Sequence, residues 1–465
     1  MSEENPIIHP YIPNSEPSVK AEMLREVGAA SIEEFYEDIP EKLRLKGYLD
    51  LPEPLLSEHQ LVQHVEGLLA KNRTARENLS FLGAGCYQHH VPAVCDEINS
   101  RGEFLTAYAG EPYDDHGRFQ ALFEYQSMMG ELLNMDVVNV PTYDGFQASA
   151  TSLRMAARIT GRKRVLICRT TSSNKLSKFK DYLKPEIEIN LVDYGMETGL
   201  LDLEMLKEKI GDEIAAVYFE VPSYLGCIDT QAEQIVELAH QSGALCVVSV
   251  DPISLGVLNP PSEYGADIVC GDIQPLGMHM QFGGGQAGFI ATRDEESFVM
   301  EYPSRLFGVA PTIVEGEYGF GDVAYERTSF AKREGGVEWV GTASALWGIT
   351  AGVYLALMGP QGMREIGEGI MQRTQYAMEE ITQIDGIGVL FFGSHHFKEF
   401  VVNFDGTSKT VREVNQDLLA RGIFGGKDIS LEFPELGQSC LFCVTEVHTK
   451  ADIDRLVDTL EEVTK

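Results

Sequence analysis

Cys246-Val247-Val248-Ser249-Val250-Asp251-Pro252 is the stretch of sequence that decides the fold of this chain. A short, mostly apolar run that ends at an Asp-Pro turn signal predicts a strand buried on both faces of a sheet. Further strands are predicted over Ala266–Cys270 and Phe289–Thr292. Asp251 therefore stands at the carboxyl end of a buried strand, where open α/β sheets bind their ligands.

This layout resembles the core of pyridoxal-phosphate enzymes of the aspartate-aminotransferase type, fold type I. In that fold an Asp pairs with the pyridine nitrogen of the cofactor, and a later Lys forms the Schiff base. Here no lysine occurs between Lys209 and Lys332, and Gln274 stands about where the Lys is expected. A glutamine has no amine for a Schiff base. The sequence therefore indicates a cofactor-enzyme fold that does not hold its cofactor covalently.

Three regions are predicted along the chain. Residues 1–80 form a polar arm of short helices, which prolines interrupt and which cannot bury much of its own surface, so we expect it to pack against a neighbouring domain or subunit. Residues 81–334 form a large α/β domain, because strands and helices alternate there and predict a mainly parallel sheet covered by helices. Residues 335–465 form a smaller α/β domain. Residues 301–337 are glycine-rich and predicted to be irregular.

Composition excludes several classes of protein. The formal net charge of −34 argues against nucleic-acid binding, which needs clustered basic residues. No apolar run approaches the length of a membrane-spanning helix, and the N-terminus lacks the pattern of a secretory signal, so a cytoplasmic location is expected. Eight cysteines in so long a chain predict free, mostly buried thiols, including the pair Cys440 and Cys443.

The densest cluster of glycine, aromatic and imidazole residues lies in the loop from Phe81 to Pro92. Loops carry function more often than cores do, so Tyr87, His89 and His90 are candidate site residues. The alternative is that one histidine faces solvent and the tyrosine simply packs.

Asp144 precedes the helix whose N-terminus cradles the cofactor phosphate in the pyridoxal fold. A carboxylate there caps the helix and repels a phosphate dianion, so this cofactor site is predicted to be altered. Gly283, Gly285 and Gly288 match the spacing of a dinucleotide motif but lead into a strand, which favours a simple turn. The polar loop Tyr108–Gly117 carries Glu111, Asp114, Asp115 and His116, but these residues lack the fixed spacing of metal ligands, and no metal site is predicted.

Taken together, these segments resemble the alpha chains of the split glycine cleavage system P-protein. The matching motifs run through nearly the whole chain and include Phe81-Leu82-Gly83-Ala84-Gly85, Gln120-Ala121-Leu122-Phe123-Glu124-Tyr125-Gln126, Val250-Asp251-Pro252-Ile253-Ser254-Leu255-Gly256, Gln274-Pro275-Leu276-Gly277 and Val444-Thr445-Glu446. Tyr87 and His89 match a Gly-x-Gly-x-Tyr-x-His loop of that family.

The resemblance implies a glycine dehydrogenase subunit in which pyridoxal phosphate is bound by the partner beta subunit, glycine dehydrogenase subunit 2. It implies decarboxylation of glycine and transfer of the aminomethyl group to the lipoyl arm of the H-protein. An α2β2 heterotetramer follows, with Tyr87, His89 and His90 at the channel between subunits, and with Asp144, Asp251 and Gln274 as degenerate cofactor-site positions.

Several loops depart from the family pattern, at residues 109–117, 220–223, 283–285 and 335–342. These loops are the ones expected to approach substrate, so a paralogue that acts on another small amino acid is an alternative. A self-sufficient pyridoxal enzyme that uses Lys332, and a scaffold without a catalytic role, are two further alternatives.

Overall fold

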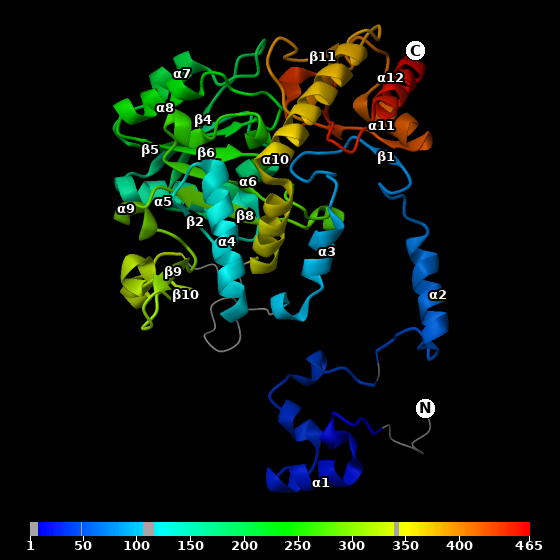
Figure 1. Ribbon diagram of the computed structural model, residues 1–465. Coiled ribbons are helices and arrows are strands. Elements are labelled where there is room, and N and C mark those ends of the chain that lie inside the picture. Colours follow the sequence, from blue (N-terminus) through cyan, green and yellow to red (C-terminus); the bar gives the residue numbers. More distant parts are fainter. Residues whose placement is uncertain (1–7, 48, 106–115, 339–343) are drawn as a thin grey trace. The chain divides into compact units, whose positions relative to one another are not determined.

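The computed structural model describes residues 8–47, 49–105, 116–338 and 344–465 (Figure 1). Two compact units divide the chain, residues 1–73 and residues 74–465. Among the described residues, no helix combines the length and the apolar character needed to cross a membrane.

The first unit is a series of short helices without a buried core. None of its described residues is buried, and many of its large apolar side chains are exposed. Its helices are η1 (Pro13–Ser15), α1 (Pro17–Glu26), η2 (Ile32–Tyr36), η3 (Glu41–Leu43) and α2 (Glu58–Leu69). Side chains of Glu16 and Ser57 cap α1 and α2 by accepting backbone N–H bonds.

The second unit is built on a seven-stranded, mostly parallel sheet, as the sequence predicts (Figure 1). Its strands, in spatial order, are β2 (Val137–Val138), β8 (Gly288–Thr292), β7 (Ile268–Asp272), β6 (Leu245–Val250), β5 (Ile214–Val221), β3 (Arg164–Cys168) and β4 (Glu188–Val192). The five strands from β7 to β4 run parallel, and β8 and β2 are antiparallel to their neighbours.

Both faces of this sheet are covered. Successive residues of β6 point to opposite faces, and Val247 packs in one apolar cluster while Val248 packs in another. All positions of β5 are buried, which explains why these strands are apolar throughout rather than alternating. The covering helices are α4 (His116–Leu133), α5 (Gly145–Thr160), α6 (Ser173–Leu183), α7 (Leu203–Lys209), α8 (Ala232–Gln241) and α9 (Glu296–Val299). Helix α3 (Ala93–Asn99) packs against the long helix α10 (Ala345–Ile381).

The prediction of an irregular segment over residues 301–337 is wrong in part. Strands β9 (Phe307–Pro311) and β10 (Tyr318–Asp322) pair there as an antiparallel hairpin. Glycine at alternate positions of β10 and partial exposure of both strands remove the apolar pattern by which a strand is recognised. Short 3-10 helices, η8 (Tyr325–Arg327) and η9 (Ser329–Gly335), follow.

A four-stranded antiparallel sheet forms the C-terminal part. It contains β11 (Gly388–Val389), β12 (Glu399–Asn403), β15 (Ser439–Cys443) and β14 (Lys427–Asp428), with helices α11 (Val411–Ala420) and α12 (Lys450–Thr464). β1 (Leu79–Ser80) pairs in parallel with β13 (Ile423–Phe424), so the segment that leads into the Tyr87 loop is anchored to this part of the chain.

Helix α10 (Ala345–Ile381) runs from beside α4 toward β11 and α12 (Figure 1). It is broken at Gly359, which has a φ of 57° and precedes Pro360. Beyond the break it touches the turn η5 (Pro252–Gly256), where a Cβ on Gly256 would lie 2.1 Å from the carbonyl oxygen of Met363. Only glycine permits this approach of two backbones.

All eight cysteines are free, as predicted, and seven are buried. Cys440 and Cys443 both lie in β15, where burial raises the pKa of each thiol. A thiol held protonated is a poor nucleophile, which argues against a redox role for the pair.

Candidate functional site

A cavity of about 110 Å³ lies at the carboxyl ends of β5, β6 and β7. This is the edge at which parallel sheets of this kind bind ligands. Its lining combines the loop after β1, the first turn of α5 and the residues that enter β12, and its polar members are Tyr87, Ser172, Lys175, Glu220, Tyr224, Ser249, Asp251, Asp272, Gln286, Lys398 and Glu399.

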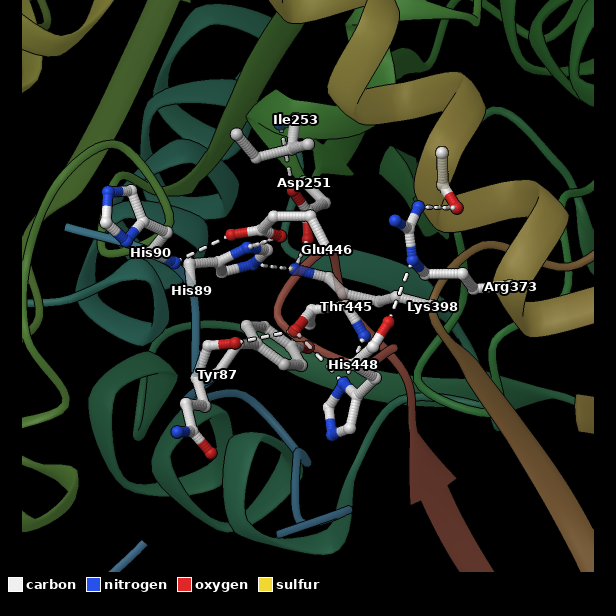
Figure 2. Close-up of polar contacts among 12 residues, drawn as sticks. Tyr87, His89, His90, Asp251, Ile253, Arg373, Lys398, Thr445, Glu446 and His448 are labelled. Atoms are coloured by element: carbon white, nitrogen blue, oxygen red, sulfur yellow. Dashed lines mark hydrogen bonds and ion pairs between the residues drawn. The ribbon is translucent and has the colours of Figure 1, made fainter. Parts of the chain in front are cut away.

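Lys398 is the centre of the polar contacts in this cavity (Figure 2). Its side chain is 1% exposed, and its ammonium forms an ion pair with the carboxylate of Asp251. The same Nζ lies 3.1 Å from Nε2 of His89 and 3.5 Å from the centroid of the Tyr87 ring. A carboxylate, an imidazole nitrogen and an aromatic face are all favourable partners for a buried ammonium.

His89 joins Lys398 to Glu446 (Figure 2). Its Nδ1 lies 2.8 Å from Oε2 of Glu446, and Glu446 Oε1 accepts the backbone N–H of His90 at 2.7 Å. An ammonium has no acceptor atom, so we assign a neutral His89 whose Nε2 accepts from Lys398 and whose Nδ1–H donates to Glu446. Burial opposes the ionisation of Glu446, but the hydrogen bonds from the His89 ring and from backbone N–H groups hold the pKa of Glu446 below its ordinary value.

Gln274 fixes the backbone of the loop at Tyr87. Its Oε1 accepts the Tyr87 N–H at 3.0 Å, and its Nε2 donates to the Tyr87 carbonyl at 2.9 Å. The Tyr87 hydroxyl then donates to Oε2 of Glu399 at 3.0 Å. Burial raises the pKa of Glu399 to about 7 and that of Tyr87 well above its ordinary value.

Two carboxylates satisfy the N-terminus of α5. Asp144 caps the helix by accepting the Gln147 N–H at 2.6 Å, as predicted, and its other oxygen pairs with Lys178 at 3.0 Å. Asp272, at the end of β7, accepts the Gly145 N–H at 2.8 Å. Burial raises the pKa of Asp272 to about 7.

The structure distributes the predicted site residues unevenly. Tyr87 and Asp251 line the cavity, His89 lies directly behind them, and Gln274 supports the loop without lining it. His90 is exposed and its backbone alone contacts Glu446.

Sequence reasoning missed Lys398, Glu399 and Asp272. Lys398-Glu399 is a charged pair that interrupts the apolar run from Phe397 to Phe404, which was the available signal. Asp272 ends a buried strand as Asp251 does.

The loops that depart from the family pattern lie in different settings. Glu220 and Pro222 line the cavity, whereas Gly283 has a φ of 91° in an exposed turn, as the turn interpretation predicts. Residues 109–115 and 339–343 lie outside the described residues, as does the side chain of His116. Lys332 is exposed on η9 and does not line the cavity. Among the described residues, no group of acidic, histidine or cysteine side chains has the arrangement of a metal site.

Comparisons with known proteins agree over nearly the whole chain. The family model described as glycine cleavage system P-protein matches residues 9–460. A protein of Staphylothermus marinus named probable glycine dehydrogenase (decarboxylating) subunit 1 is 40% identical, with 98% of each chain covered. A protein of the same name from Carboxydothermus hydrogenoformans is 41% identical, with 97% of this chain and 99% of the relative covered.

Solved structures give the same picture. A glycine decarboxylase (P-protein) of the glycine cleavage system, in inhibitor-bound form, matches with a TM-score of 0.84 at 33% identity. The match covers 98% of this chain and all of that one. A sphingosine-1-phosphate lyase of Burkholderia pseudomallei matches with a TM-score of 0.65 at 14% identity, covering 91% of this chain and 94% of that chain, which is a likeness of fold alone.

Proposed function

Because the chain belongs to the glycine cleavage system P-protein family, we propose that it is the alpha subunit of a split glycine decarboxylase, a glycine dehydrogenase (decarboxylating). Its fold is that of the pyridoxal-phosphate-dependent enzymes of fold type I. The observation that carries the proposal is the near full-length match to relatives named subunit 1.

The residues of this chain do not fit pyridoxal phosphate as their own cofactor. Gln274 offers no amine, and both of its amide atoms are already bonded to the backbone of Tyr87. Asp144 and Asp272 occupy the N–H groups at the start of α5, where a phosphate is expected. This misfit supports a division of labour in which the beta subunit, glycine dehydrogenase subunit 2, holds the cofactor.

In the proposed enzyme this chain completes an α2β2 assembly in the cytoplasm and shapes the channel reached by the lipoyl arm of the H-protein. The aminomethyl group left after decarboxylation of glycine passes to that arm. Burying the substrate carboxylate away from water favours loss of CO2, so an enclosed interface suits the chemistry. The exposed apolar side chains of the first unit supply a surface for such an interface.

Co-expression with the beta subunit tests the proposal. The complex is expected to exchange labelled CO2 into the carboxyl group of glycine when lipoylated H-protein is present, and this chain alone is expected to show no exchange. Stable co-purification without exchange into glycine would refute the proposed function.

The same CO2 exchange assay tests which amino acid is the substrate and whether this chain has a catalytic role. Exchange into alanine or serine in preference to glycine would favour the paralogue, for which the loop at Glu220 and Pro222 is the structural reason, since both residues line the cavity. Full turnover in His89→Ala and Tyr87→Phe complexes would favour the scaffold. Schiff-base absorbance of pyridoxal phosphate in this chain, purified without its partner and lost in Lys332→Ala, would favour a self-sufficient enzyme.

A further inference from the structure

Three points at which the fold family holds its cofactor have a protein partner in this chain, namely Asp251, Gln274 and the N-terminus of α5. We propose that the chain fills its own cofactor site: Lys398 takes the place of the pyridine nitrogen on Asp251, and Asp272 takes the place of the phosphate on α5. The cofactor site is then occupied by side chains of the chain itself, and only a small cavity of about 110 Å³ remains there. The filled cofactor site is a property of the chain itself, whichever amino acid the assembled enzyme decarboxylates.

Lys398 has the charge and the donor needed for this replacement. In the fold family a protonated pyridine nitrogen pairs with an Asp at the end of a central strand. Here the Lys398 ammonium pairs with Asp251, which follows β6, and the same ammonium lies against the Tyr87 ring. A buried cation still pairs with the buried carboxylate, but the cation is the Lys398 ammonium and not the pyridinium of a cofactor.

The backbone at Lys398 is strained in a way that serves this contact. Lys398 has a φ of 49°, which a residue with a long side chain rarely adopts, and such strain persists where the surrounding structure enforces it. The backbone here passes directly against Gly226, because a Cβ there would lie 1.8 Å from the carbonyl oxygen of Glu399. The Gly226 carbonyl also accepts the Phe397 N–H at 3.0 Å.

Asp272 makes the matching replacement at the other end of the site. Helix N-termini bind anions through free N–H groups. Here Oδ2 of Asp272 accepts the Gly145 N–H, while its Oδ1 accepts those of Gln274 and Ala287 at 2.9 and 3.3 Å. With these contacts made, the cavity that remains is about 110 Å³, below the roughly 300 Å³ at which small-molecule pockets begin.

The test is to remove both side chains and measure binding to the full-length chain, purified without its partner. Pyridoxamine 5′-phosphate is the probe, because it keeps the pyridine nitrogen and the phosphate but has no aldehyde to react with surface lysines. Equilibrium dialysis and the rise in melting temperature with probe both report binding, and the second works for a weakened variant because a ligand stabilises the state that binds it.

We expect the wild-type chain to show no saturable binding of the probe. The variant K398A/D272S is expected to bind it saturably, roughly tenfold or more tightly than the detection limit set by the wild-type chain. K398R keeps the cation and is expected to remain closed. K450A removes a lysine that is ion-paired on the surface of α12, and is the matched control that is expected to behave as wild type.

Three results would overturn the inference. They are saturable binding of the probe by the wild-type chain, a folded K398A/D272S variant that binds no better than wild type, and a variant that stays unfolded with saturating probe. Because CO2 exchange is not measured here, failure of this test and failure of the proposed function are separate outcomes.

Discussion

The first unit and the cavity of the second unit satisfy their side chains in opposite ways. Apolar side chains of the first unit, such as Leu61, Val65 and Leu68 on α2, are between 43% and 50% exposed and have no core of their own. In the cavity, Lys398, Asp251 and Asp272 each find a partner within the chain. The contrast separates two proposals: contact with another subunit is expected at the apolar surface of the first unit, whereas the cavity of the second unit is proposed to be filled by side chains of the chain itself.

The largest expected effect comes from making the first unit polar. L61D/L68D places two carboxylates on the exposed face of α2, and loss of apolar contact at an interface removes about 1–3 kcal/mol per anchoring side chain. Co-purification with the beta subunit and CO2 exchange should both fall by about 100-fold or more. Size-exclusion chromatography of the mixed subunits measures the loss of assembly. Q60E, on the same helix, is the control, and unchanged assembly of L61D/L68D would contradict the role given to this surface.

Breaking the ion pair in the cavity is the next largest effect. K398M leaves Asp251 buried without its cation, which should cost about 3–5 kcal/mol of unfolding free energy. D251N should cost a similar amount, and the double variant less than the sum, because both substitutions remove the same contact. Denaturant unfolding of the isolated chain measures all three. Additive losses would show that the two side chains are not coupled.

The pH dependence of stability tests the buried acids. A carboxyl whose pKa is raised on folding binds its proton more tightly in the folded chain, so stability is greatest at low pH and is lost as pH rises. For Glu399 the window runs from its ordinary value of 4.5 to about 7. E399Q should reduce the decrease of the unfolding free energy with pH by up to about 1.4 kcal/mol per pH unit within that window. Denaturant midpoints at several pH values measure the slope, with the exposed E461Q as control, and parallel slopes would contradict the prediction.

The smallest expected effect separates two neighbouring histidines. H89Q removes the link between Lys398 and Glu446, and should lower stability by about 1 kcal/mol and slow CO2 exchange by several-fold. H90A should change neither quantity, because only its backbone N–H is used. Melting temperature and exchange rate measured side by side give the comparison, and equal losses in both variants would remove the distinction.

Most of the fold can be predicted from local patterns in the sequence. β6, β7 and β8 are apolar runs bounded by turns, and the Asp144 cap precedes an amphipathic helix, so each is visible in a short window. The hairpin of β9 and β10 has no such pattern, because its glycines and its partly exposed residues show no alternation of apolar and polar side chains.

The site was harder to predict because its contacts join distant segments. Asp251 was predicted from its place after β6, but its partner Lys398 enters from the start of β12, and no local pattern connects them. His89 and His90 have the same chemistry and adjacent places in one loop, yet one is buried and the other exposed. Only the fold decides which of the two meets Lys398.

The backbone contact between Gly256 and Met363 has a mechanical consequence. It ties the second half of α10, beyond the break at Gly359, to the turn that follows Asp251, with no side chain between them to absorb a shift. A side chain at position 256 would push these two backbones apart and would displace the turn that follows the carboxylate under Lys398.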